Sequence, residues 1–592
     1  MPNSLFRTKK IESILKEGSD DGHGATGLKR VLNVRDLTFF GIAAIIGAGS
    51  FSSLGDACFK GGPGVVVLFI ICGIACAFTA FCYSEFASRI PVAGSAYTYA
   101  YASFGELFAW IIGWALIMEY SIGNIYVAFS WSDYFTSFLH KVNVHMPDYL
   151  TCSYQEAKKA FLNYRELTSP EQLEFLKNQA NAELINAWNN CPVAGSLKMI
   201  FDLPALVINV LITTLVYIGI KESRNFSNAM VILKLAVVAL VIIVGAYYIN
   251  PDNWFPVNDA GVKNFMPNGF GGVMAAVSGV FFAYIGFDAV SVLAEESKNP
   301  QRDLPRGMTY SLVICTVVYI LLALVLTGVV NYKQFENVGD PLAKIFEVKN
   351  VGWMQLLVSV CAVIAMTSVL LVFQMGQPRI WMSMSRDGLL PPVFQRIHKK
   401  YKTPSFATIL TGVVVGLPIL FTDKTFVLDF TSIATLFAFV LVCGGVLLIP
   451  RKEKEAGRFN MPYINAQFIF PLLILAAIII LAVWAPGYFS DILNFNFSAN
   501  ADYAANKVSF MDLATPKISL IIFWLSCIIL SIFALVKKYS LIPLMGVATC
   551  LYLLTGMTKS NWAWFLGWLL LGLVIYFFYG YKKSRLANAE QG

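Results

Sequence analysis

The sequence predicts an all-α polytopic membrane protein, on the evidence of its composition and of the length of its apolar runs. Hydrophobic residues make up 57% of the 592-residue chain and charged residues only 14%, whereas soluble proteins carry roughly 25% charged residues. The mean hydropathy is +0.64. The apolar residues come in runs of about 20, the length that crosses a bilayer as a helix. The net charge of +8 lies largely in short loops between these runs, so it does not indicate a nucleic-acid partner.

About fourteen segments are predicted to span the bilayer, each end being approximate. They are 37–58, 64–88, 105–139, 203–220, 228–249, 270–294, 308–330, 351–381, 404–421, 426–449, 467–485, 517–537, 541–557 and 562–580. The resulting organisation is an N-terminal tail 1–36, a first group of five spans within 37–249, a second group of five within 270–449, further spans within 467–580 and a tail 581–592.

The distribution of lysine and arginine predicts the orientation. Basic residues occur in the N-terminal tail and then in every second loop, as in the loop 379–402 and the tail after Gly580. Cytoplasmic loops of membrane proteins carry this excess. We therefore expect an integral protein of the plasma (inner) membrane with both termini in the cytoplasm, and no cleavable signal at the N-terminus.

The first predicted span contains an interruption at Gly47-Ala48-Gly49-Ser50. Two glycines separated by one residue favour unwinding, because glycine loses more backbone freedom in a helix than any other residue. Unwound backbone at membrane depth is tolerated only where it lines a cavity or is buried in protein. Its free N–H and C=O groups can bind a polar solute, so a site is expected here.

The sixth span contains a matching interruption, at Gly286 and Asp288 in FFAYIGFD. Spans one and six are equivalent, and run in opposite directions, if a unit of five helices is repeated with inverted topology. Paired interrupted helices of this kind are typical of secondary transporters. No P-loop is present, so ATP is not used directly. A membrane-bound enzyme would need a polar catalytic cluster that the sequence does not offer, whereas a sensor that kept a transporter fold remains an alternative.

Two ionisable residues within spans are candidates for coupling or gating, because a charge at membrane depth is costly. Lys234 lies in span five, where it either snorkels to the headgroups or holds the broken first span through backbone carbonyls. Glu119 lies in span three as a proton site, a substrate contact or a hydrogen-bonded strut. No histidine lies in a predicted span, and no metal site or other cofactor is expected; protons are the coupling ion considered.

The external loop 140–202 is long and polar. It is predicted to hold two short helices, 154–164 and 170–189, bracketed by Cys152 and Cys191. The loop faces an oxidising compartment in the expected orientation, so a disulfide and two free thiols are both compatible with the sequence.

Six stretches of the chain resemble the amino acid–polyamine–organocation (APC) superfamily, and most closely its cationic amino acid transporter branch and bacterial relatives. They are GIAAIIGAGSF (41–51), YSEFASRIPVAGSAY (83–97), GWALIMEY (113–120), FAYIGFD (282–288), EESKNPQRDLP (295–305) and SRDGLLP (385–391). The likeness covers most of residues 30–450. The last four spans and the external loop are outside it.

The resemblance implies a LeuT-like fold of two inverted five-helix repeats, with about four additional C-terminal helices and the substrate near the membrane midplane. In such transporters the unwound first helix binds the amino acid's carboxylate, and carbonyls of the unwound sixth helix accept from its ammonium group. Transferred to this chain, the substrate-binding residues are Ile45, Gly47, Ala48, Gly49, Ser50, Phe282, Ala283 and Ile285. Lys234 matches the lysine that replaces a sodium ion in sodium-independent members, which implies proton coupling, exchange or facilitation.

Two departures from the family pattern bear on the substrate. Ala48 stands where the family often has a hydroxyl residue, and Ser50 replaces a branched apolar one. In span eight Leu370, if it faces the pocket, leaves little room for a long side chain. The sequence therefore favours amino acid transport with a weak preference for neutral substrates. An amino acid/amine exchanger and a cationic amino acid transporter are the alternatives. Lipid is the expected surrounding, and the oligomeric state is undetermined.

Overall fold

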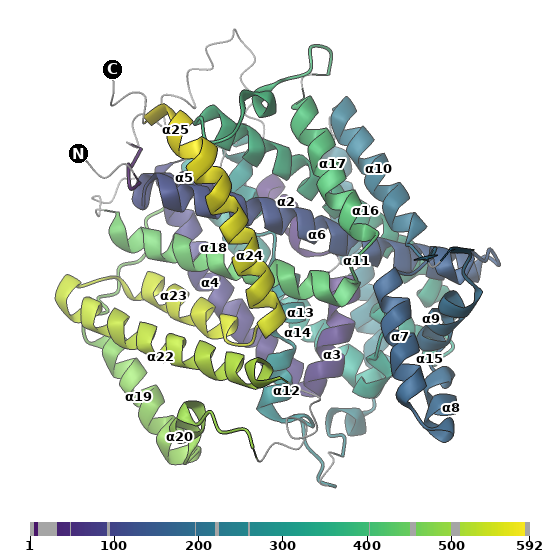
Figure 1. The fold of residues 1–592 in the computed structure, drawn as a ribbon. Helices are drawn as coiled ribbons and strands as arrows, with labels where there is room; N and C mark the ends of the chain where they lie inside the picture. Colours follow the sequence, from purple (N-terminus) through teal and green to yellow (C-terminus); the bar gives the residue numbers. More distant parts are fainter. Residues whose placement is uncertain are drawn as a thin grey trace.

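The computed structural model describes residues 5–9, 32–47, 49–90, 95–195, 197–219, 224–257, 261–401, 403–449, 458–498 and 509–586, which form a bundle of long helices (Figure 1). The helices of the first half are α2 (Val34–Ile45), η1 (Gly49–Ser53), α3 (Leu54–Gly61), α4 (Val65–Arg89), α5 (Ser95–Ser103), α6 (Glu106–Lys141), α7 (Tyr154–Glu166), α8 (Ser169–Lys177), α9 (Gln179–Asn190), α10 (Leu203–Ile218) and α11 (Arg224–Tyr247). Those of the second half are α12 (Gly269–Ala275), α13 (Val277–Tyr284), η5 (Asp288–Glu296), α14 (Pro300–Val329), α15 (Pro341–Val348), α16 (Gly352–Arg386), α17 (Ser405–Ile419), α18 (Lys424–Leu448), α19 (Ile469–Trp484), α22 (Phe510–Lys537), α23 (Leu541–Leu554) and α24 (Lys559–Ile575).

Helix is present in every segment that was predicted to span the bilayer. Within the described ranges, eight helices are long and apolar enough to cross a membrane, or nine if the bent pair Gly269–Ala275 and Val277–Ser291 counts as one span. That pair bends by 44°. Four further apolar helices are shorter: α10, α17, α19 and α23. The chain is therefore an integral membrane protein of predominantly helical structure.

The C-terminal helices form a layer of their own. Phe470 on α19, Phe523 on α22 and Leu544 on α23 belong to a small apolar cluster separate from the main core. Helix α23 joins this layer to the main bundle, since its residues Val547, Cys550 and Leu553 belong to the main core. Helix α24 adds a second connection, to α6. The indole N–H of Trp114 on α6 donates to the carbonyl of Trp568 at 2.8 Å, and the two rings stack with centroids 4.7 Å apart.

Both ends of the described chain meet on one face of the bundle (Figure 1). The Lys9 ammonium group pairs with the Asp387 carboxylate at 2.8 Å, and the backbone N–H of Arg585 donates to the carbonyl of the same aspartate at 3.0 Å. At the end of α4, Arg89 donates to Glu85, one helical turn before it, at 2.7 Å. The termini thus lie on the same side of the molecule.

The opposite face carries the long loop, whose residues 148–191 we call the cap. It holds three helices, α7, α8 and α9, where the sequence predicted two. The extra break falls at Asn178, whose side chain accepts from the backbone N–H of Ala180 at 3.1 Å and so begins a new helix. Cys152 and Cys191 pack in one small apolar cluster but are free thiols. A strand pair, Val193–Ala194 and Leu197–Lys198, follows the cap and is the one departure from an all-α prediction in the described chain.

Asp202, the N-cap residue of α10, should make stability depend on pH. Its carboxylate accepts from the Ser132 hydroxyl at 2.6 Å and from the Ala205 N–H at 2.9 Å, but burial raises its pKa to about 8. The folded state then binds this proton more tightly than the unfolded chain, whose pKa is about 4. The contribution of Asp202 to stability is therefore fully present below a pH of about 4, and it is lost as the pH rises from about 4 to about 8.

The variant Asp202→Asn keeps both acceptor contacts and removes the charge. We expect wild-type protein in detergent to melt about 2–4 °C lower at pH 8.5 than at pH 5.5, and the variant to lose most of this difference. Equal pH dependence in the two proteins would contradict the assignment.

Candidate functional site

The first predicted span is interrupted between Ile46 and Gly49, which we call the first break. The interruption lies at the two glycines that predicted it. Helix α2 ends at Ile45, because Ile46 has an extended backbone (φ −79°, ψ 95°). The chain resumes as a π-helix at Gly49. Ala48 lies outside the described residues. A side chain at Gly47 would collide with Val369 on α16, so Val369 faces the break.

The second break, residues 285–287, interrupts the sixth span at its predicted glycine. Helix α13 ends at Tyr284, and Ile285 is extended (φ −61°, ψ 135°). Gly286 has φ +117°, a conformation that side chains rarely adopt. A Cβ there would also lie 2.9 Å from the Cβ of Ala44 on α2. The glycine is therefore required both by its backbone angle and by its close approach to the first broken helix.

The two breaks lie against each other. A Cβ on Gly49 would lie 2.5 Å from the Cα of Ala283, so the backbones touch. The Tyr319 hydroxyl on α14 lies 2.8 Å from the carbonyl oxygens of both Ile45 and Ala283. The Ser53 hydroxyl lies 2.8 Å from the Gly49 carbonyl oxygen and 2.9 Å from that of Gly279. Two side chains therefore fix the two broken helices to each other.

Some backbone groups at the breaks have no partner among the described residues. The N–H groups of Gly47 and Gly49 donate no backbone hydrogen bond there, and the Ile285 carbonyl accepts none. The other two predicted acceptors are occupied: the Phe282 carbonyl accepts from the Ile285 N–H at 3.2 Å, and the Ala283 carbonyl from Tyr319. A carbonyl oxygen has a second lone pair, so both can still accept. The Ser50 hydroxyl donates to the Gly47 carbonyl at 3.0 Å.

Lys234 points into the bundle. Its side chain is 1% exposed, and its ammonium group donates to the Ser368 hydroxyl at 2.6 Å and to the carbonyls of Ala43 and Ile46 at 3.3 and 3.4 Å. This is the geometry of a cation that anchors the end of α2, and it excludes snorkelling to the headgroups. Helix α16 is anchored to the same point through Ser368.

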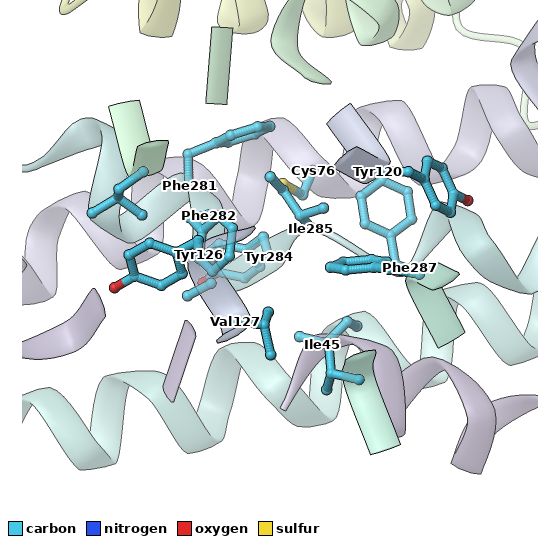
Figure 2. Close-up of a cluster of buried hydrophobic side chains, with 14 of the residues drawn as sticks. Ile45, Cys76, Tyr120, Tyr126, Val127, Phe281, Phe282, Tyr284, Ile285 and Phe287 are labelled. Carbon is cyan, nitrogen blue, oxygen red and sulfur yellow. The ribbon is translucent and has the colours of Figure 1, made fainter. Parts of the chain in front are cut away.

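Apolar side chains surround the breaks (Figure 2). The rings of Phe282 and Tyr126 meet edge to face, with centroids 4.5 Å apart, and Ile45, Val127 and Ile285 belong to the same cluster in the close-up. The polar groups at this place are thus supplied by the backbone, by Lys234 and by the hydroxyl groups of Ser50, Ser53, Tyr319 and Ser368, while most of the surrounding side chains are hydrophobic.

Glu119 lies near the second break. It is 4% exposed on α6, beside Thr435 on α18 and close enough to Asp288 to feel its charge. One oxygen of the Glu119 carboxylate has no hydrogen-bond partner among the described residues. The structure therefore places it near Asp288, the residue that begins η5 directly after the second break.

Three residues of the site were not predicted: Tyr319, Ser53 and Tyr126. Tyr319 had a detectable signal, since a tyrosine in the middle of an apolar span needs a partner for its hydroxyl group. Ser53 and Tyr126 had none, because their importance depends on contacts with residues far away in the sequence.

The paired breaks beside a buried lysine indicate a membrane transporter, since discontinuous helices are typical of the substrate sites of transporters. The chain belongs to the amino acid permease family: the family's model matches residues 32–500, and a second model, the C-terminus of these permeases, matches residues 539–584.

Individual relatives agree with this assignment. The chain is 40% identical to the branched-chain amino acid permease BcaP of Bacillus subtilis over 463 residues, covering 78% of this chain and 89% of that protein. It is 39% identical to the methylthioribose transporter of the same organism, with the same coverage. An Arabidopsis thaliana protein, vacuolar cationic amino acid transporter 2, is 30% identical over an alignment that covers 99% of this chain and 94% of that protein. The resemblance to the APC superfamily and its cationic branch is confirmed, and the protein is a transporter, not an enzyme.

Tyr319→Phe should weaken transport by about tenfold while the protein still folds. The change removes the hydroxyl group that binds the Ile45 and Ala283 carbonyls. Loss of such a buried hydrogen-bond donor destabilises the arrangement of the two breaks by about 1–3 kcal/mol. Initial uptake rates into proteoliposomes measure the effect. Tyr310→Phe, on an exposed part of the same helix, is the matched control; equal rates in both variants would contradict a bridging role for Tyr319.

Proposed function

We propose that this protein moves neutral amino acids across the membrane by alternating access, without sodium. The observation that carries the proposal is the contact of Gly49 with Ala283, which brings two interrupted helices together beside unpartnered backbone groups. A zwitterion matches these groups. Its carboxylate accepts from the N–H groups of Gly47 and Gly49, and its ammonium group donates to the carbonyl of Ile285. We also assign Ala48 and Ser50 to the substrate site. Ser50 belongs to the same turn as Gly47 and Gly49, and Ala48 is assigned from the family resemblance alone.

The apolar surroundings favour a neutral side chain. Phe282, Tyr126 and Ile45 offer hydrophobic contact, and Val369 narrows the space beside Gly47. A cationic side chain would need a carboxylate or several carbonyls for its distal charge. The candidate carboxylate from the sequence, Glu119, lies beside the Thr435 hydroxyl and near a second acid, Asp288; we assign it to coupling and not to the substrate. Among the relatives, this chemistry agrees best with the one named for branched-chain amino acids.

Lys234 supports sodium independence and proton coupling. Its ammonium group fills the position between the end of α2 and α16, where a fixed positive charge takes the place that a sodium ion has in related folds. A buried lysine can release its proton when the bundle rearranges. Glu119, with its unpartnered oxygen, is the second residue that we assign to coupling.

We further propose a LeuT-like arrangement of two inverted repeats, 37–249 and 270–449, followed by additional spans within 467–580. The matching positions of the two breaks support it, as does the meeting of both chain ends at Asp387 on one face. The positive loops place that face in the cytoplasm and the cap outside. The similarity to a permease and a transporter of Bacillus subtilis supports a location in the plasma membrane.

The test is uptake of a panel of labelled amino acids into proteoliposomes, with and without an inward proton gradient and in the absence of sodium. Saturable uptake of leucine, isoleucine or valine, increased by the proton gradient, is the expected result. Strong uptake of arginine or lysine without uptake of neutral amino acids would show that the substrates are cationic amino acids. Uptake of methylthioribose alone would show that the substrate is a sugar. Binding without flux would indicate a sensor.

A further inference from the structure

A cavity of about 470 Å³ lies between the cap and the bundle. The cap contributes Cys152 and Glu156, and the helices below contribute Asp133 on α6 and Lys424 at the start of α18. Ser52 and Tyr126 are also among the lining residues. Charged groups of both signs therefore surround a space that ends on residues next to the two breaks.

Those two residues connect the cavity to the site. Ser52 lies in η1, directly after the first break, and its hydroxyl donates to the Gly339 carbonyl at 3.0 Å. Tyr126 packs on Phe282 of the second broken helix. Ser52 and the Tyr126–Phe282 ring pair thus separate the cavity from the breaks. A solute that enters from the cap side passes through this cavity before it reaches them.

The cap is tied to the first residues of α18. The Lys159 ammonium group on α7 pairs with the Asp423 carboxylate at 2.6 Å, while the other oxygen of that carboxylate caps α18 by accepting from the Phe426 N–H at 2.9 Å. One residue further on, the Lys424 N–H donates to the Glu156 carboxylate at 3.2 Å. The cap and the start of α18 are therefore joined by two adjacent polar contacts.

The start of α18 is tied in turn to the helix below. The Lys424 ammonium group pairs with the Asp133 carboxylate on α6 and lies 5.6 Å from the centroid of the Tyr126 ring. The same lysine thus contacts the cap through its backbone and the floor of the cavity through its side chain. Movement of the cap away from α18 would therefore displace Lys424, whose side chain covers the Tyr126 ring.

We infer that Lys159, Asp423 and Lys424 form an outer latch that keeps the cap closed over the entry path. The inference rests on the proposed function, because it concerns access to the proposed site. The latch is a gating device that contacts no substrate in the site. Release of the Lys159–Asp423 pair lets the cap and the start of α18 move apart, which opens the cavity and then uncovers Tyr126.

The test measures access to the native Cys152, which lines the cavity. Full-length protein in proteoliposomes is labelled with a membrane-impermeant maleimide, and the rate of modification at Cys152 is read by mass spectrometry. Lys159→Gln and Asp423→Asn each remove the ion pair, and asparagine keeps an acceptor for the Phe426 N–H. Each variant should be labelled about threefold to fivefold faster than wild type, the range expected for loss of a partly exposed ion pair.

The double variant supplies the decisive comparison. If the two residues act through their pair, the double variant is labelled no faster than either single variant. Lys158→Gln is the matched control, since Lys158 is an exposed lysine on the same helix, and it should be labelled at the wild-type rate. Rates that are unchanged in both single variants, or that multiply in the double variant, would overturn the latch.

Uptake links the latch to transport. Initial uptake of a low external amino acid concentration should increase by a similar factor in both single variants. Faster labelling with unchanged uptake would show that the cap does not control entry and would overturn the inference. If wild-type protein takes up no amino acid, it is the proposed function that fails, and the labelling rates still decide whether the latch closes the cavity.

Discussion

Replacing Gly49 by valine should abolish transport while the protein still inserts into the membrane. Even a single Cβ at this position would lie 2.5 Å from the Cα of Ala283, a backbone atom that cannot move aside as a side-chain end can. The two breaks would be forced apart, and the N–H of residue 49 would be displaced from its place opposite the second break. We expect the affinity for the transported amino acid to fall at least about tenfold, since overpacking of this kind costs about 1–3 kcal/mol or more.

The matched control is Gly271→Val on α12. A Cβ at Gly271 meets no atom within 4 Å, and the residue is exposed on the same predicted span as the second break. The control variant should keep wild-type affinity and flux. Wild-type binding by Gly49→Val, in protein that elutes as a single folded species, would contradict the assignment of the site.

The second large effect is expected for Lys234→Ala. The change removes the cation that donates to the Ala43 and Ile46 carbonyls and to the Ser368 hydroxyl. Hydrogen bonds to charged groups contribute about 1.5–3 kcal/mol each, so we expect uptake to fall by about tenfold or more. Any uptake that remains should no longer respond to an inward proton gradient, because the proposed proton carrier is gone.

Lys537→Ala provides the comparison for this variant. Lys537 is an exposed lysine at the end of α22, where a cation meets the headgroups, and its replacement should leave the rate and its pH dependence unchanged. If Lys234→Ala takes up amino acid at the wild-type rate with the same dependence on pH, the lysine neither anchors the first break nor couples transport to protons.

The features that could be predicted from the sequence are those that depend on local chemistry. Gly47 and Gly49 in an apolar run predicted the first break, and Gly286 predicted the second, because glycine in a membrane helix weakens the helix at a definite point. Lys234 could be singled out because a charge at membrane depth requires a partner. Its actual partners, two carbonyls and a hydroxyl group, agree with one of the two predicted alternatives.

The contacts that hold the site together depend on tertiary structure and could not be predicted. Tyr319 and Ser53 each bind carbonyls on two separate helices, and no spacing in the sequence specifies which carbonyls these are. Similarly, the packing of Val369 on α16 against Gly47 joins residues that are far apart in the sequence. The extra helix boundary at Asn178 was missed although its capping chemistry is local, because the surrounding pattern is helical on both sides.

The cap illustrates the same limit on a larger scale. The sequence indicated a polar, helical loop with two cysteines, and the structure confirms helices there. Its attachment through Lys159 and Asp423 joins residues more than two hundred positions apart. The role that we infer for the cap therefore depends on an ion pair that only the folded structure brings together.

The most direct test of the site is a density map of the protein in a lipid nanodisc, saturated with the amino acid that it transports best. The predicted result is ligand density between the two breaks, with its carboxylate within hydrogen-bond distance of the N–H groups of Gly47 and Gly49 and its ammonium group at the Ile285 carbonyl. Continuous α-helix through residues 45–50 and 283–288, or the amino acid bound only elsewhere, would contradict the account.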